Sequence, residues 1–220
     1  MDFINNVFEV LLNIDQHLNL LIINYQFWTY LILFIIIFAE TGFVVTPFLP
    51  GDPLLFAAGA LIAGGGTGLN IYLLALILFV AAVAGNQVNY SLGQYLGPKV
   101  FKPENKFLKF SYYHKTQAFF TKHGGKSVIL SRFFPVLRTF VPFVAGVIKM
   151  PFYKYSYYNI TGGFLWIISF LMLGYLFGNL PFVKENFSWV ILIISIFTTL
   201  PPVLGALYSK YSPKKAIIQS

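Results

Sequence analysis

The sequence contains no cysteine and few charged residues, and both absences restrict what the protein can be. Without cysteine there are no disulfide bonds, iron–sulfur clusters or catalytic thiols. Charged residues make up 10% of the 220 positions, against roughly 25% in a soluble domain. A soluble domain of this length needs a polar surface that so few charges cannot supply. The chain is instead 57% hydrophobic and 19% aromatic, which indicates an integral membrane protein with interfacial aromatic belts.

The positive charge is concentrated in two places. Seven lysines lie between Lys99 and Lys126, and three more lie in the tail 209–220. Because apolar stretches flank these clusters, they are typical of cytoplasmic loops that obey the positive-inside rule, and we expect no nucleic acid as a partner. The first 16 residues contain acids and no Lys or Arg, so we expect no cleaved signal peptide. No catalytic constellation or metal-ligand spacing appears, so we expect no enzyme, metal or cofactor.

The apolar pattern predicts an all-α polytopic membrane protein. Residues 1–24 form an N-terminal segment in which apolar positions recur at helical period between residues 3 and 23. This favours an amphipathic helix lying at the membrane surface, with a short span as the alternative. Residues 25–208 form the membrane domain. Its predicted spans are Phe27–Ala39, Leu69–Leu96, Tyr153–Leu180 and Phe187–Tyr208.

Two further apolar segments, 44–65 and 127–149, are broken by proline and glycine. Such segments leave backbone groups unpaired, which hydrocarbon does not tolerate, so each must lie inside protein or line a cavity. We therefore predict two re-entrant helical hairpins. The residues expected to shape them are Pro47, Pro50, Gly51, Pro135, Pro142 and Gly146.

The two halves of the membrane domain share a pattern. In each, a proline-broken segment is followed by an Ala-Gly pair and about thirty residues later by Tyr-x-x-Gly, at Tyr90–Gly93 and Tyr175–Gly178. If the basic connector 97–126 and the tail are cytoplasmic, the first hairpin enters from outside and the second from the cytoplasm. This predicts an inverted repeat with opposed hairpins and both termini in the cytoplasm.

Four ionisable residues lie within or beside the broken segments, namely Glu40, Asp52, Arg132 and Arg138. The last two are the only arginines in the chain. Arginine binds carboxylate or phosphate through two parallel hydrogen bonds. Each charge at membrane depth costs roughly 2.5–3.5 kcal/mol, so pairing or water must offset most of the cost. We expect the arginines to bind a phosphate while the acids exchange protons and compete for them. The alternative is a neutral quartet that locks the hairpins together.

The two acids differ in their surroundings. Glu40 follows an apolar run, so it is the better candidate for a proton carrier, although burial and a nearby arginine act on its charge in opposite directions. Asp52 lies between Gly51 and Pro53 in a tight turn. The sequence leaves open whether Asp52 caps a helix or contacts a substrate or ion.

These motifs resemble the signatures of the DedA family. The first is Glu40 followed by Pro-Phe-Leu-Pro-Gly-Asp at 47–52; the second is Ser-Arg-Phe-Phe-Pro-Val-Leu-Arg at 131–138, continuing to Pro142 and Ala145-Gly146. The segment 85–97 also fits, and the similarity extends from about Phe27 to Gly178. The resemblance implies two opposed re-entrant hairpins, a fold shared with eukaryotic VTT-domain lipid scramblases. It also implies that Glu40, Asp52, Arg132 and Arg138 are the functional residues.

The resemblance further implies a role in envelope homeostasis that depends on the proton-motive force. Some family members are thought to return undecaprenyl phosphate, and others phosphatidylethanolamine, across the cytoplasmic membrane. We therefore expect a proton-linked flippase or scramblase of the bacterial cytoplasmic membrane. Its partners would be protons and a polyprenyl phosphate or phospholipid. The sequence leaves open whether the chain also binds a second copy of itself. The alternatives are a proton-coupled transporter of small ions or drugs and a non-transporting assembly factor.

Overall fold

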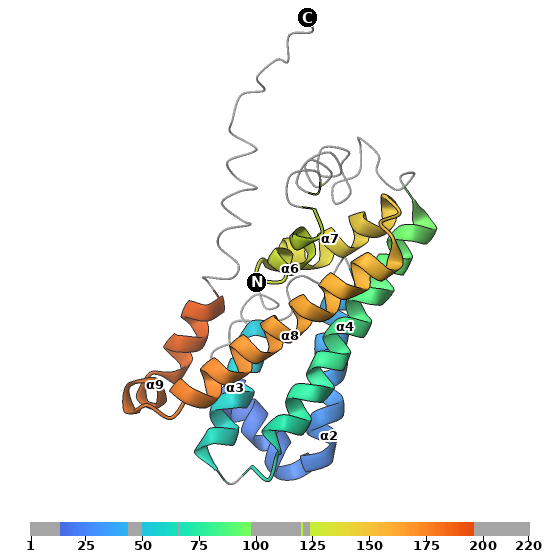
Figure 1. The fold of residues 1–220 in the computed structure, drawn as a ribbon. Helices are drawn as coiled ribbons and strands as arrows, with labels where there is room; N and C mark the ends of the chain where they lie inside the picture. Colours follow the sequence, from blue (N-terminus) through green and yellow to red (C-terminus); the bar gives the residue numbers. More distant parts are fainter. Residues whose placement is uncertain (1–13, 44–49, 66, 98–119, 121–123, 196–220) are drawn as a thin grey trace, which may run out of the picture.

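The computed structural model describes residues 14–43, 50–65, 67–97, 120 and 124–195, and their regular secondary structure is entirely helical (Figure 1). Residues 187–195 form a further helical stretch. The predicted connector, except for Gly97, Phe120 and residues 124–126, and the tail 209–220 lie outside the described residues. The helices are α2 (Ile14–Gly42), α3 (Gly51–Gly64), α4 (Ile71–Leu96), α6 (Lys126–Ser131), α7 (Pro135–Val147), α8 (Phe152–Phe177) and α9 (Pro181–Glu185).

Two helices are long and apolar enough to cross a membrane by length and composition. Helices α4 and α8 each have 26 residues, and an 18-residue stretch of each has a mean hydropathy of 2.1 and 1.9, respectively. At 1.5 Å per residue each is about 39 Å long, more than the roughly 30 Å hydrocarbon core requires. They coincide within a few residues with the predicted spans Leu69–Leu96 and Tyr153–Leu180.

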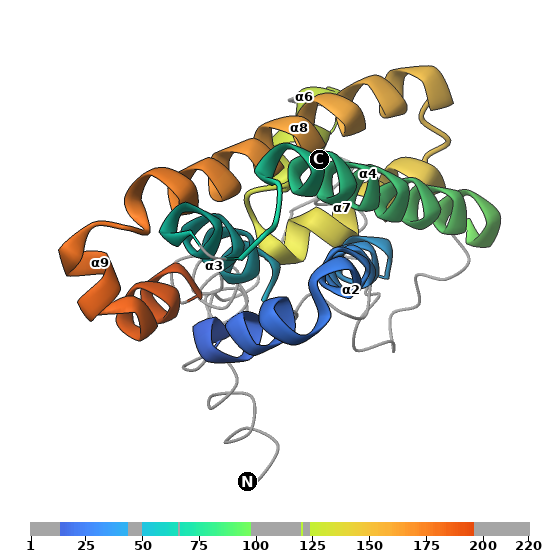
Figure 2. The ribbon, with the colours of Figure 1, turned by 90° about the horizontal axis from the view of Figure 1, so that it is seen from below.

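Two shorter apolar helices, α3 and α7, lie in the predicted broken segments. They have 14 and 13 residues, so each is only about 20 Å long and too short to span the membrane. Helix α3 packs against α8, and α7 packs against α4. Each short helix therefore packs on the long helix of the other half of the chain. Figure 2 shows α3 and α7 between α2 and the α4–α8 pair.

Glycines allow these helix pairs to approach closely, and the contacts in the two pairs are equivalent. In both pairs, a Cβ added to the glycine of the short helix or of the long helix would fall within about 2 Å of the facing backbone. The contacts are Gly59 with Leu171 O and Gly174 with Phe56 O between α3 and α8, and Gly146 with Tyr90 O and Gly93 with Phe143 O between α7 and α4. In the packing, Gly174 of α8 therefore has the same role as Gly93 of α4. The sequence pattern had instead paired Gly93 with Gly178, which lies one helical turn after Gly174.

Helix α2 differs from its prediction, because it continues without a break across residue 24. The Tyr30 hydroxyl accepts a hydrogen bond from Asn70 N (2.8 Å) at the start of α4. Gly42, the last residue of α2, contacts Gly85 in the middle of α4. The stretch predicted as the span Phe27–Ala39 thus runs from one end of α4 to about half its length. Helix α3 then returns to the same end, where residues 65–70 connect it to α4.

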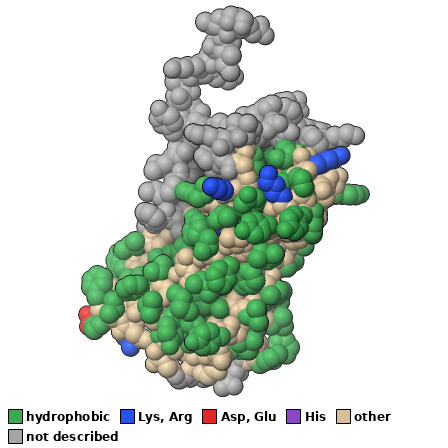
Figure 3. Space-filling view, viewed as in Figure 1, with side chains coloured by type: hydrophobic (Ala, Val, Ile, Leu, Met, Phe, Trp, Pro, Cys, Tyr) green, Lys and Arg blue, Asp and Glu red, His purple; other side chains and the backbone are tan. Residues whose placement is uncertain are grey.

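The surface formed by α4 and α8 is largely apolar, with basic residues near its ends (Figure 3). Exposed apolar side chains follow the length of both helices. Of the described lysines, Lys126, Lys149 and Lys154 lie near the start of α8, whereas Lys184 follows its end. This distribution agrees with a membrane protein whose more basic end faces the cytoplasm.

Candidate functional site

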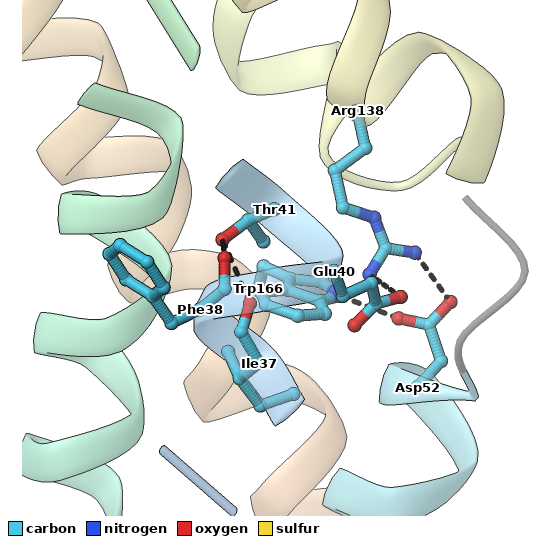
Figure 4. A network of polar contacts seen from close by, with 7 residues as sticks. All are labelled: Ile37, Phe38, Glu40, Thr41, Asp52, Arg138 and Trp166. Carbon is cyan, nitrogen blue, oxygen red and sulfur yellow. Dashed lines mark hydrogen bonds and ion pairs between the residues drawn. The ribbon is translucent and has the colours of Figure 1, made fainter. Parts of the chain in front are cut away.

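Three of the four charged residues predicted for the site meet in one ion-pair cluster. Arg138 donates from Nη1 to Glu40 Oε1 (3.1 Å) and from Nη2 to Asp52 Oδ2 (3.0 Å). None of the three is more than 3% exposed. Glu40 comes from the last turn of α2, Asp52 from the first turn of α3, and Arg138 from the beginning of α7 (Figure 4). The cluster therefore joins the consecutive helices α2 and α3 to α7, because Arg138 lies 98 positions from Glu40 and 86 from Asp52.

Asp52 contacts the interior and does not cap α3. The N-cap residue of this helix is Pro50, and no side chain provides a cap hydrogen bond. The second carboxylate oxygen of Asp52, Oδ1, accepts a hydrogen bond from Trp166 Nε1 (2.7 Å). Both oxygens of Asp52 therefore accept hydrogen bonds from buried donors.

Glu40 has a different environment, because only one of its oxygens accepts a hydrogen bond that the described part of the structure shows. Oε2 is buried and has no hydrogen-bond partner among the described residues. A Cβ on Gly51 would lie 1.8 Å from this oxygen. Gly51, predicted only as a turn residue, thus also leaves the space that the Glu40 carboxylate occupies. The unbonded oxygen can take up a proton without breaking a hydrogen bond to the cluster.

Arg132, the fourth predicted residue, is separate from this cluster. It is fully buried, and its hydrogen bonds go to neutral acceptors: Nη2 donates to Asn159 Oδ1 (2.5 Å) and more weakly to Ala82 O (3.3 Å). When the Asn86 amide is oriented so that its nitrogen donates to Thr41 O (3.1 Å), its oxygen accepts from Arg132 Nε (3.2 Å) and Nη2 (3.1 Å). Among the described residues, both ion pairs belong to Arg138. Of the four residues in the alternative of a buried quartet, Glu40, Asp52 and Arg138 are thus the ones that ion pairs join among the described residues.

The sequence analysis did not identify Trp166, the largest of the fully buried side chains. Its indole lies 4.5 Å from Arg138 Cζ and 6.0 Å from Arg132 Cζ, distances at which the ring face attracts a guanidinium. It also holds Asp52 through Nε1. A tryptophan in an apolar span has no sequence signal that separates this role from ordinary packing.

A polar stripe on α4 connects the site to its neighbours. Asn89 Nδ2 donates to Thr41 O (3.3 Å) on α2 and to Thr139 O (2.7 Å) on α7. Tyr90 donates to Met150 O and stacks on Tyr155 with ring centroids 4.2 Å apart. These contacts fix the ends of α2 and α7 on α4, and so they position Glu40 and Arg138.

The remaining predicted residues shape the helix ends and contacts. Pro50 precedes α3 and Pro135 begins α7, a position where the missing proline N–H costs no helix bond. Pro142 lies inside α7, and Gly146 allows α7 to contact α4. Pro47 lies outside the described residues.

Comparisons with known proteins identify relatives along nearly the whole chain. The VTT domain family model matches residues 49–176. Protein DedA of Escherichia coli K12 is 43% identical over 217 residues, which cover 98% of this chain and 99% of that protein. Inner membrane protein YqjA of the same strain is 34% identical over 177 residues, 80% of this chain and 78% of that protein. A membrane protein of Mycobacterium leprae is 43% identical over 173 residues, 78% of this chain and 77% of that protein. No solved structure matches.

Proposed function

The chain belongs to the DedA family of VTT-domain membrane proteins, and from this premise we propose that it transports an anionic lipid headgroup in a process linked to the proton-motive force. The membrane would be the bacterial cytoplasmic membrane, and the cargo a polyprenyl phosphate or a phospholipid. The observation that carries the proposal is the buried charge set, in which Arg138 binds both acids while Arg132 binds only neutral groups. Ionisable residues at membrane depth mark substrate and proton pathways by default.

We place this charge set near the middle of the membrane, where two opposed re-entrant hairpins meet. The supporting features are the short lengths of α3 and α7, their exchange of long partner helices, and the equivalent glycine contacts in the two pairs. The first hairpin consists of the second half of α2 together with the whole of α3. These bounds replace the predicted range 44–65. The second consists of α6 and α7, joined by three residues. Broken helices that meet at mid-membrane form the substrate sites of inverted-repeat transporters.

The chemistry of the site favours a phosphate. A guanidinium presents donors in a planar fork that matches the oxygens of phosphate, and it stays charged at any physiological pH. With both acids ionised, Arg138 and its two partners carry a net charge of −1, and Arg132 carries +1. An incoming phosphate makes this buried set more negative, and a proton on Glu40 restores the balance. Protonation of Glu40 also loosens one of the two ion pairs of Arg138, so that this arginine becomes available to the phosphate.

The extensive apolar exterior favours a lipid as the molecule that carries the phosphate. Exposed apolar side chains cover α4 and α8 from end to end, so the acyl or prenyl chains of a lipid can stay in the bilayer while the headgroup crosses through protein. The end with Lys126, Lys149 and Lys154 would face the cytoplasm, and Lys184 the outside. The cytoplasmic position of both termini stays a prediction.

The test is the transbilayer movement of labelled undecaprenyl phosphate and labelled phosphatidylethanolamine in proteoliposomes. Wild type is compared with Arg132→Ala and with Lys154→Gln, which removes an exposed positive charge far from the buried set. We expect the wild type and Lys154→Gln to move at least one lipid and Arg132→Ala to move neither. If correctly inserted wild-type protein moves neither lipid, the proposal fails, and a small-ion transporter or an assembly factor becomes the better account.

A further inference from the structure

Arg132 is a buried cation that forms no ion pair with a carboxylate of the described residues. It is 0% exposed, and both acids of the site are held by Arg138. Nε and Nη2 are occupied by Asn86, Asn159 and a backbone carbonyl. Nη1 is buried and has no hydrogen-bond partner among the described residues. The net negative charge of the Arg138 cluster and the neutral hydrogen-bond partners offset the cost of burying Arg132, while Nη1 keeps a donor that no described residue accepts.

The neutral neighbours hold the guanidinium in a fixed position. Asn159 accepts from Arg132 through Oδ1 and is itself anchored by its Nδ2, which donates to Val83 O (3.0 Å). A Cβ on Gly163 would lie 3.3 Å from Arg132 Nη2, and one on Gly162 would lie 3.3 Å from its Cγ. The α8 backbone therefore packs directly against the arginine. Amides at these positions orient the guanidinium and leave its charge intact, which a carboxylate would not do.

We propose that Arg132 is the primary phosphate site and that Asn159 is the positioning residue that keeps it available. This inference rests on the proposed function and adds to it a division of roles between the two arginines. The phosphate group of a lipid binds first to Nη1 of Arg132, and this step breaks neither ion pair of Arg138. Arg138 then joins only when Glu40 is protonated. Asn159 carries specificity because it supplies an acceptor without a charge.

The decisive variant is Asn159→Asp, which places a carboxylate at the atom that now accepts from Arg132. It would form an ion pair with Arg132 and so compete with phosphate, although the volume of the side chain stays the same. The matched control is Gln87→Glu, which makes the same amide-to-acid change on α4. Gln87 Oε1 accepts a hydrogen bond from Ser156 (3.3 Å), and a carboxylate oxygen at this position can accept the same bond. Gln87 Nε2 has no partner among the described residues, so its replacement by oxygen breaks no described bond. The control therefore adds the same charge at a residue that makes no described hydrogen bond to Arg132.

The measurement is calorimetric binding of dihexanoyl phosphatidylglycerol, and separately of inorganic phosphate, to the full chain in a neutral detergent at pH about 7.5. We expect the wild type and Gln87→Glu to bind the short-chain lipid, and Asn159→Asp to bind it about tenfold more weakly or worse, the loss of one charge-assisted hydrogen bond. Acidification that protonates the new carboxylate should restore binding. Inorganic phosphate should bind more weakly than the lipid, because it lacks the apolar part.

Equal binding of the lipid by wild type and Asn159→Asp would overturn the inference, as would a wild type that binds no lipid or only inorganic phosphate. If Asn159→Asp does not fold, Arg132→Lys replaces it. Lysine keeps the charge but cannot bond Asn86, Asn159 and a phosphate in the same plane, so we expect a similar loss, and unchanged binding would refute us. Binding at equilibrium requires no transport. Wild type that binds lipid but does not move it would therefore refute the proposed function alone.

Discussion

The two acids that share Arg138 should respond very differently to neutralisation. Glu40→Gln and Asp52→Asn each remove one negative charge and leave Arg138 with one carboxylate, so the electrostatic change is similar. The hydrogen bonds to the described residues differ, because both oxygens of Asp52 accept from donors, whereas only Oε1 of Glu40 does. An amide at position 52 must therefore turn its NH₂ group towards Arg138 or Trp166, both of which are donors. An amide at position 40 can place its NH₂ group where Oε2 now lies unbonded.

The magnitude of the difference follows from these bonds. Asp52→Asn loses one hydrogen bond and leaves a buried donor unsatisfied, which costs about 1–3 kcal/mol. Glu40→Gln keeps its acceptor for Arg138 and loses no described hydrogen bond, although its buried NH₂ group has no described acceptor. Asp52→Asn should therefore lower the free energy of unfolding by about 1 kcal/mol more than Glu40→Gln, the value of the one hydrogen bond that it loses. The fold would tolerate a neutral residue 40 better than a neutral residue 52.

The assay is reversible unfolding in mixed detergent micelles, followed by circular dichroism. A double-mutant cycle adds Trp166→Phe, which removes the second donor. If the donor–donor conflict is the cause, Asp52→Asn should cost less in the Trp166→Phe background than in wild type. Equal losses from Glu40→Gln and Asp52→Asn, or a larger loss from Glu40→Gln, would refute the assignment of Glu40 as the exchangeable acid.

Three further predictions test other parts of the account. Trp166→Phe keeps an aromatic ring beside Arg138 but loses the bond to Asp52, so we expect about 1–2 kcal/mol less stability and slower lipid movement; an unchanged transport rate would contradict the role of the indole N–H. Gly59→Ala places a Cβ 2.2 Å from a backbone oxygen of α8, whereas at Gly64 the nearest atom is 3.5 Å away. In the same unfolding assay, Gly59→Ala should lower the free energy of unfolding by about 1–3 kcal/mol, and Gly64→Ala should lower it by less than about 0.5 kcal/mol. Because the chain has no cysteine, Lys154→Cys and Lys184→Cys can be labelled by an impermeant maleimide, and we expect labelling from the cytoplasm and from outside respectively; labelling of both from one side would reject the topology.

Much of the membrane architecture could be predicted from the sequence because its signals are local. Long uninterrupted apolar runs predicted α4 and α8, and proline-broken runs predicted the positions of α3 and α7. The burial of Glu40, Asp52 and Arg138 followed from charges placed in or next to apolar segments. In each case the free energy of placing a group in hydrocarbon decides the outcome, and that free energy depends mainly on the neighbours in sequence.

The partners inside the site could not be predicted, because they depend on which helices pack together. Arg132 and Arg138 are six positions apart, yet Arg138 binds carboxylates and Arg132 binds amides. That difference arises where α6 ends and α7 begins, which turns the two side chains towards different helices. Trp166 and Asn159 lie in a span that gives no sign of a polar role. The helical period of α8 places them on its buried face, but only the fold shows which charge each contacts.

The central claim is that proton binding and lipid-phosphate binding are linked at one buried charge set, and an imposed pH gradient tests it most directly. Proteoliposomes with wild-type protein or Glu40→Gln would carry a labelled lipid that the wild type moves, and its distribution between leaflets would be followed with and without the gradient. We predict that the gradient shifts the distribution in wild-type vesicles and not in Glu40→Gln vesicles, because the variant has no proton to exchange at residue 40. A wild-type distribution that is the same with and without the gradient would contradict proton exchange, and an equal shift in Glu40→Gln would contradict its assignment to Glu40.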